Sequence, residues 1–230
     1  MSLPAILTLL EGLVFEIATW LVLVPKTLVA VIRRPRMLPA LAAAAHGTSE
    51  EPPDEYVSPV LLWLIVGVVP GIPMIVTEQG PAWIAHGLLR SLGVEASIIA
   101  AATLLLLGPL SFATAQALVK RRRLARSVLR QPFAIQCGCF APLFLGYFVG
   151  LAADFQTVVA RYELVYGIVS IVALLGSLLW FLRAEYVVLR LDAASPLRAV
   201  ATMALGIVLW AGFIALSRLI LVMVSVYYGG

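Results

Sequence analysis

The residues that could do chemistry in this chain are few, and they stand inside long apolar segments. Gln116, Gln136 and Arg218 are the polar side chains best placed to meet a solute or a partner from within such a segment. Burying an arginine in hydrocarbon is costly, so Arg218 has to reach water or pair with an acid. The candidate acids are Glu78, Asp154 and Glu163. We expect snorkelling or a structural ion pair at Arg218; the alternative is a substrate-binding or gating role.

Two cysteines, Cys137 and Cys139, are separated by a single glycine and raise the question of a metal site. Thiolates suit Cu(I) or zinc. A complete zinc site needs three or four ligands, however, and the two histidines, His46 and His86, stand in distant segments. Free cysteine is also common in apolar interiors. We therefore predict neither a metal nor another cofactor.

The signatures of common hydrolases and nucleotide-binding enzymes do not occur in the sequence. It contains no His-Glu-x-x-His, no Gly-x-Ser-x-Gly, no P-loop and no Gly-x-Gly-x-x-Gly. Closely spaced acids occur only in the polar stretch 46–55, where nothing fixes their geometry. We predict that the protein is not an enzyme.

The composition indicates which elements must position these residues. The chain is 62% hydrophobic and 12% charged, whereas soluble domains carry about 25% charged residues. A transmembrane helix needs roughly 20 apolar residues. The segments that meet this requirement are Ser58–Val76, Ser97–Val119, Phe133–Ala153, Leu164–Leu182 and Val200–Val226. The predicted fold is all-α, a polytopic membrane helix bundle with five transmembrane helices.

The cations between these segments alternate in number from loop to loop. Six of the sixteen Lys and Arg residues lie between Lys120 and Arg130. Thirteen fall on one side of the expected membrane and only Arg90 and Arg161 on the other. The positive-inside rule then predicts a cytoplasmic Lys120–Arg130 loop and an external C-terminus. Anionic lipid headgroups account for the basic loops, so we expect no nucleic-acid partner. The excess of arginine over lysine favours a bacterial inner membrane.

The N-terminal stretch Leu3–Val24 is long enough to span a membrane but contains Glu11 and Glu16, whose insertion cost offsets its apolar residues. The prolines expected to interrupt this region are Pro25, Pro35 and Pro39. We expect an interfacial or re-entrant helix; the alternative is a sixth span. With the polar linker that follows, this helix makes up region 1–57, and the transmembrane domain occupies 58–230.

Glycine and proline concentrate in the first and third expected spans. Gly67-x-x-x-Gly71 and Gly146-x-x-x-Gly150 would let two helix backbones approach closely, and we expect them to serve packing. The alternative is a discontinuous helix, broken near residues such as Pro142, whose freed backbone groups line a site at the midplane. Secondary transporters bind their substrates in this way.

Two short segments resemble the Yip family, small membrane proteins named for interaction with Rab-type GTPases. Asp54-Glu55-Tyr56-Val57-Ser58-Pro59 is similar to the family's acidic-aromatic-proline entry into the first span. Gly138-Cys139-Phe140-Ala141-Pro142 is similar to its glycine-aromatic-proline element of the third span, with Cys139 where an aromatic residue is usual. The resemblance covers about residues 50–226, mostly as topology. It implies five helices, a cytoplasmic N-terminal region and a non-enzymatic role in trafficking or membrane organisation; bacterial relatives are often labelled permeases.

The first functional prediction is a non-catalytic integral membrane protein acting through protein or lipid contacts. Its cytoplasmic face would be formed by Tyr56, Pro59 and the basic loops. Its partners would be the lipid bilayer and other membrane subunits or further copies of the chain. The alternatives are a small permease, with Gln116, Gln136, Pro142 and Arg218 as candidate residues, and an accessory subunit of a larger membrane complex.

Overall fold

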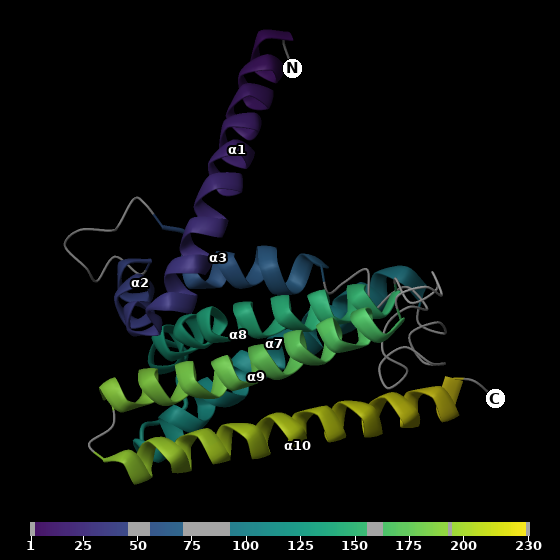
Figure 1. Cartoon of the computed structure of the whole chain (residues 1–230). Coiled ribbons are helices and arrows are strands. Elements are labelled where there is room, and N and C mark those ends of the chain that lie inside the picture. Colours follow the sequence, from purple (N-terminus) through teal and green to yellow (C-terminus); the bar gives the residue numbers. More distant parts are fainter. Residues whose placement is uncertain (1–2, 46–55, 71–92, 156–162, 193–194, 229–230) are drawn as a thin grey trace.

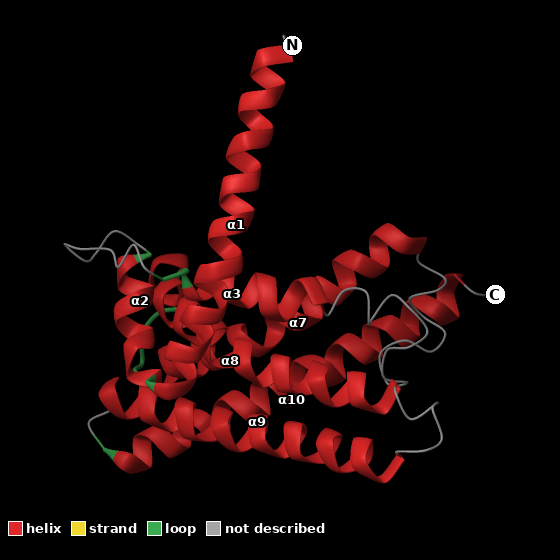
Figure 2. Ribbon diagram, turned by 45° about the horizontal axis from the view of Figure 1, so that its top comes forward, coloured by secondary structure: helices red, strands yellow, loops and turns green. Residues whose placement is uncertain are grey.

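The computed structural model describes residues 3–45, 56–70, 93–155, 163–192 and 195–228, and every element in these ranges is helical (Figure 2). Four long helices form a bundle: α7 (Gly93–Val119), α8 (Arg126–Phe155), α9 (Glu163–Asp192) and α10 (Pro196–Tyr228). They are preceded by α1 (Leu3–Arg33), the short 3-10 turn Pro35–Met37, α2 (Leu38–Ala44) and α3 (Pro59–Trp63). A π-helical turn, Leu64–Val68, continues α3.

Three of these helices are long and apolar enough to cross a membrane: Arg126–Gly150 in α8, Gly167–Leu191 in α9 and Pro196–Leu216 in α10. Two shorter apolar helical stretches, Pro59–Val68 and Leu105–Val119, fall within the first and second expected spans. The rest of the first expected span, after residue 70, lies outside the described residues. The all-helical prediction is confirmed for the described residues.

The helices extend further into the basic regions than the predicted spans did. The third span was expected to begin at Phe133, but α8 begins at Arg126. The fourth was expected to end at Leu182, but α9 continues to Asp192. A cation on an exposed helix face does not have to end the helix, because its long stem carries the charge to water. The connection between α7 and α8 is therefore shorter than the predicted Lys120–Arg130 loop.

Most prolines do not interrupt the helices that contain them. Pro25, expected to break the N-terminal helix, lies inside α1, and Pro132 and Pro142 lie inside an unbroken α8. The prediction of a break at Pro25 and the alternative of a discontinuous third span are therefore wrong. A proline removes one intrahelical hydrogen bond, whereas ending a helix in a packed or apolar setting would leave several backbone groups unpaired. Pro35, by contrast, starts a 3-10 turn directly after α1, as expected.

The core is built around Phe140 of α8, whose ring is fully buried. Its ring centroid lies 5.5 Å from that of Phe112 on α7, 4.8 Å from that of Phe181 on α9 and 5.5 Å from that of Trp210 on α10, all at steep interplanar angles. Edge-to-face contacts of this kind add to the free energy of apolar burial. One residue thus joins all four long helices.

Glycines allow the close approach of α8 to α9. A Cβ atom added at Gly146 would lie 3.0 Å from the backbone oxygen of Ala173, and one at Gly150 would lie 3.3 Å from that of Ser170. The packing role predicted for this pair is therefore confirmed. Gly67 leaves room for the ring of Trp63 on its own helix, and Gly71 lies outside the described residues.

Replacing Gly146 by alanine is expected to lower the free energy of unfolding by about 1–3 kcal/mol, because the added methyl group meets backbone that cannot rotate away. Gly176 on α9 is the matched control, since a Cβ there meets nothing within 4 Å. Gly176→Ala should stabilise the protein by up to about 1 kcal/mol through helix propensity alone. Unfolding in mixed micelles of increasing SDS content measures both. Equal changes in the free energy of unfolding for Gly146→Ala and Gly176→Ala would contradict the close approach of α8 to α9 at Gly146.

Helix α1 projects away from the bundle and crosses the direction of α9 and α10 in both views (Figures 1 and 2). Its C-terminal part is anchored to the rest of the protein: the Thr27 hydroxyl accepts a hydrogen bond from Val57 N (2.9 Å), and Trp180 Nε1 donates to Ile32 O (3.0 Å). Further out, Leu21 is 71% exposed. This helix needs a medium or a partner that covers its apolar side chains.

The basic segments gather at one end of the bundle, which we call the cationic end. Figure 1 shows α2, the C-terminal end of α9 and the N-terminal end of α10 together there, with the C-terminus of the chain at the opposite end. The exposed cations at this end are Arg33, Arg34, Arg36, Arg121, Arg122, Arg123, Arg126, Arg130, Arg190 and Arg198.

Candidate functional site

A cavity of about 460 Å³ opens at the cationic end, between α2, α7, α8 and α9. Its lining combines charged and amide groups with the apolar side chains of α9. The lining residues are Pro39, Gln116, Lys120, Arg122, Ser127, Val128, Gln131, Pro132, Ile135, Val188, Leu189 and Leu191. Among these described lining residues two are cations and none is an acid.

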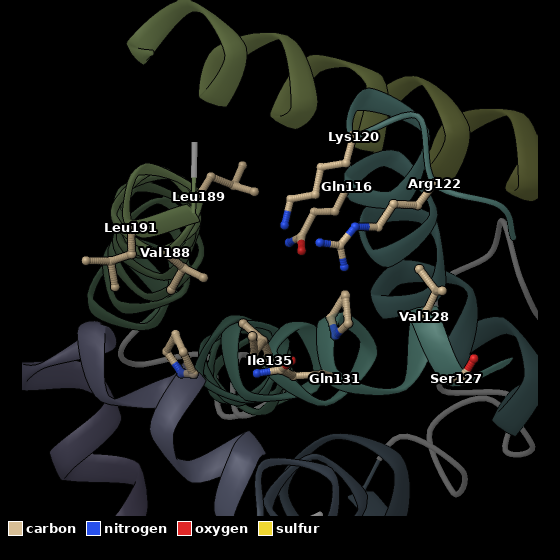
Figure 3. Close-up of a pocket in the computed structure, with 12 residues that line it drawn as sticks. Gln116, Lys120, Arg122, Ser127, Val128, Gln131, Ile135, Val188, Leu189 and Leu191 are labelled. Carbon is tan, nitrogen blue, oxygen red and sulfur yellow. The ribbon is translucent and has the colours of Figure 1, made fainter. Parts of the chain in front are cut away.

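Three polar side chains from the end of α7 and the turn after it converge on this cavity. Figure 3 shows the Lys120 ammonium, the Gln116 amide and the Arg122 guanidinium directed toward the same space, facing the apolar side chains of α9. Gln116 is only 4% exposed, and its amide faces the cavity.

The backbone that carries the two cations adopts a strained turn. The Arg122 N–H donates to Ala117 O (2.9 Å) and the Arg121 N–H to Leu118 O (2.9 Å), a pair of bonds that closes the C-terminus of α7. This is the Schellman arrangement, in which the residue at the position of Arg121 is usually glycine. Arg121 has φ 53°, in the left-handed region. The turn keeps an arginine where the backbone favours glycine.

Replacing Arg121 by glycine is expected to raise the free energy of unfolding by up to about 1 kcal/mol, because glycine adopts a positive φ without steric cost. Arg123→Gly is the control: it removes the same charge two residues away, where φ is not positive. That change should be neutral or slightly destabilising. Thermal unfolding in detergent compares the two, and destabilisation by Arg121→Gly would show that the guanidinium contributes more than the strain costs.

One helical turn deeper than the cavity, a polar pair joins α8 and α9. Gln136 Nε2 donates a hydrogen bond of 2.8 Å to Glu185 Oε1, and both residues are 0% exposed. Glu185 shares its helix face with Val188 and Leu189 of the cavity wall. Gln136 Oε1 and Glu185 Oε2 find no donor among the described residues. A carboxyl group with one amide donor at this depth requires a proton or a cation to offset the cost of its charge.

The other predicted site residues are scattered. Tyr56 is half-buried with the Lys26 ammonium 5.2 Å from its ring centroid, a cation–π contact. Pro59 begins α3 and is buried, and Pro142 is buried within α8. Arg218 lies on α10, but its side chain and those of its candidate partners fall outside the described residues. Of the six predicted residues, the structure gathers Gln116 and Gln136 near the cationic end.

Cys137 and Cys139 are both buried and unpaired with one another. The Cys139 side chain lies beside the Glu185 carboxyl group. No group of three potential metal ligands occurs in the ranges that the structure describes. The histidines His46 and His86 lie outside those ranges.

Glu185 was missed by the sequence analysis, because the fourth span was expected to end at Leu182. In the structure Glu185 lies within the apolar stretch Gly167–Leu191. A signal was present: Phe181, Ala184, Glu185, Val188 and Leu189 recur at helical spacing and are all buried. The exposed face of the same turns carries Arg183, Tyr186 and Arg190.

Comparisons of this chain with protein-family models, with curated proteins and with solved structures found no match.

Proposed function

We propose that this chain is a non-catalytic, multi-pass membrane protein that acts through contacts of its cationic end with lipid headgroups or with protein partners. In this proposal five helices span the membrane, α1 lies in the interface, the cationic end faces the cytoplasm and the C-terminus is external. The membrane would be a bacterial inner membrane.

The observation that carries the proposal is the surface of α9 and α10. Both helices have long apolar stretches that are mostly exposed, in contrast to the mostly buried α8. Leu179 on α9, for example, is 67% exposed. A contiguous apolar surface of this kind would promote aggregation in water, whereas acyl chains solvate it without cost.

The course of α1 supports an interfacial position. It runs across the bundle direction rather than along it (Figure 1). Glu16 and Lys26, both exposed, alternate along the helix with the exposed apolar residues Leu21 and Val22. A helix with charged and apolar groups that lies across the spanning helices matches the geometry of a membrane-surface helix.

The Yip-like type is part of this proposal and rests on the two segments that resemble the family. They come from distant parts of the chain and meet in the structure: a Cβ atom added at Gly138 would lie 3.3 Å from Cβ of Pro59. Tyr56 precedes this contact and lies under the Lys26 ammonium. Contact between the two segments supports a shared structural role for them.

Copurification tests the proposal. The full chain, tagged after Gly230 and extracted in a mild detergent or a lipid-preserving polymer, should bring down a stoichiometric membrane partner or a second copy of itself, or retain anionic lipid. In intact cells the same tag should react with a membrane-impermeant reagent. A monodisperse, lipid-free monomer, or a tag shielded in intact cells, would overturn the proposal or its orientation.

A second candidate function, a small permease, is favoured by the Gln136–Glu185 pair. Buried ionisable residues in membrane helices commonly mark ion or proton pathways. The pair lies one helical turn below a cavity that opens at the cationic end. Proton or solute flux into liposomes that contain the purified protein tests this function, with Glu185→Gln as the variant. Flux abolished by that substitution favours transport, and absence of flux in the unaltered protein argues against it.

A further inference from the structure

The cavity at the cationic end has the chemistry of an anion site. Two cations line it, and no acid is present among its described lining residues. We infer that this cavity binds a phosphate group through Lys120, Arg122 and Gln116. The inference deepens the proposed function, because it names the chemical group that the cationic end would recognise.

The first argument is the convergence of donors. Ammonium and guanidinium groups form the strongest hydrogen bonds that protein side chains offer to phosphate oxygens. The Gln116 amide points into the same space (Figure 3). A bound phosphate oxygen would accept a hydrogen bond from this amide.

The second argument is the N-terminus of α8, which lies on the cavity wall. Ser127, Val128 and Gln131, which belong to the first two turns of this 30-residue helix, line the cavity. Backbone N–H groups and the positive end of the helix dipole favour an anion there. The opposing negative end of α7 is partly neutralised, because the turn residues Lys120, Arg121 and Arg122 donate their N–H groups to its last carbonyls.

The third argument is the strained turn. Arg121 holds a positive φ between the two lining cations, Lys120 and Arg122. Backbone strain at a non-glycine residue persists where the surrounding structure or function maintains it. Because of this turn, the side chains of Lys120 and Arg122 both reach the cavity. In a continuing α-helix these two residues, two positions apart, would point to nearly opposite sides of α7.

The phosphate has two possible sources, and both share this chemistry. One is the headgroup of an anionic lipid, which requires the membrane orientation of the proposed function. The other is a soluble phosphate compound, which does not. The apolar side of the cavity, formed by Val188, Leu189 and Leu191, would contact the non-phosphate part of either ligand.

The experiment compares two variants that lose the same charge. Lys120→Gln/Arg122→Gln removes both lining cations, and Arg123→Gln/Arg126→Gln removes two exposed cations from the same segment that do not line the cavity. The purified full chain is titrated in detergent with inorganic phosphate, with sodium chloride at equal ionic strength as reference, and ligand binding is measured as a rise in the thermal midpoint. In a second arm the protein is placed in nanodiscs of phosphatidylcholine with or without phosphatidic acid, and retained lipid is identified by native mass spectrometry.

We expect the half-saturating phosphate concentration to rise about tenfold or more in the lining variant and to change less than about twofold in the control, since a charged hydrogen bond contributes roughly 1.5–3 kcal/mol. Gln116→Leu, which changes no charge, should weaken binding severalfold. Retention of phosphatidic acid together with weak binding of inorganic phosphate would identify the lipid source; binding of inorganic phosphate alone would identify the soluble one.

Equal losses in the two charge variants would overturn the inference in favour of general surface attraction, as would an unaltered protein that binds neither probe. Either result would leave the proposed membrane role intact, because copurification and C-terminal labelling test that role separately. If the lining variant unfolds in the absence of ligand, the Gln116→Leu titration decides the question.

Discussion

Phe140→Ala is expected to lower the free energy of unfolding by about 3–5 kcal/mol, the range found for large-to-small changes at buried aromatic residues. The ring contacts aromatic side chains of all three other long helices, so its loss opens a cavity that no single helix can close by shifting. Gly108 reinforces this expectation, because a Cβ atom there would lie 2.6 Å from the Phe140 ring. At Gly108 the backbone of α7 therefore lies so close to the Phe140 ring that a larger residue would not fit.

Unfolding by SDS in mixed micelles, followed by circular dichroism, measures this effect. Val149→Ala is the control on the same helix, because Val149 is exposed and its loss should change stability by no more than about 0.5 kcal/mol. Phe140→Leu should recover part of the loss, since it refills most of the space. Similar stability changes for Phe140→Ala and Val149→Ala would mean that the aromatic cluster does not hold the helices together.

Gln136→Leu is expected to lower the free energy of unfolding by about 3 kcal/mol, because it removes the amide donor to a fully buried carboxyl group. Glu185 Oε1, which is fully buried, would then lose its amide partner. The double substitution Gln136→Leu/Glu185→Leu should be considerably less destabilising than the sum of the two single changes. Replacing both members of a buried polar pair by apolar residues removes the unsatisfied group itself.

A double-mutant cycle in the same micelle assay measures the coupling between the two residues. Gln131→Leu is the control for the loss of a glutamine from α8, since Gln131 is exposed. Additive effects of Gln136→Leu and Glu185→Leu would show that the hydrogen bond across α8 and α9 contributes nothing to stability. Strong coupling would establish the pair as a structural link beneath the cavity, which the flux measurement then tests for a role in transport.

The sequence predicted the long helices well because hydropathy over some 20 residues is a property of each segment alone. It also predicted packing at Gly146 and Gly150, which the contacts with Ala173 and Ser170 confirm. Its errors in helix boundaries arose because a single cation or proline was taken to end a helix. It ended α9 at the first cation after Leu182 and broke α1 at Pro25, whereas both helices continue. A helix in a packed or apolar setting tolerates these residues, because ending it leaves more backbone groups unpaired.

Hydropathy and charge along the chain suffice to predict that apolar helices alternate with basic segments and that few polar side chains lie inside them. Which of those polar groups meet depends on how the helices pack against one another. Gln136 and Glu185 are far apart in sequence and face each other because α8 and α9 pack closely through glycine. The cavity likewise draws its donors from α7, the turn after it and the start of α8. Hydropathy and charge act along a segment, whereas a site depends on which helix faces are turned toward one another, and that is fixed by packing across the whole bundle.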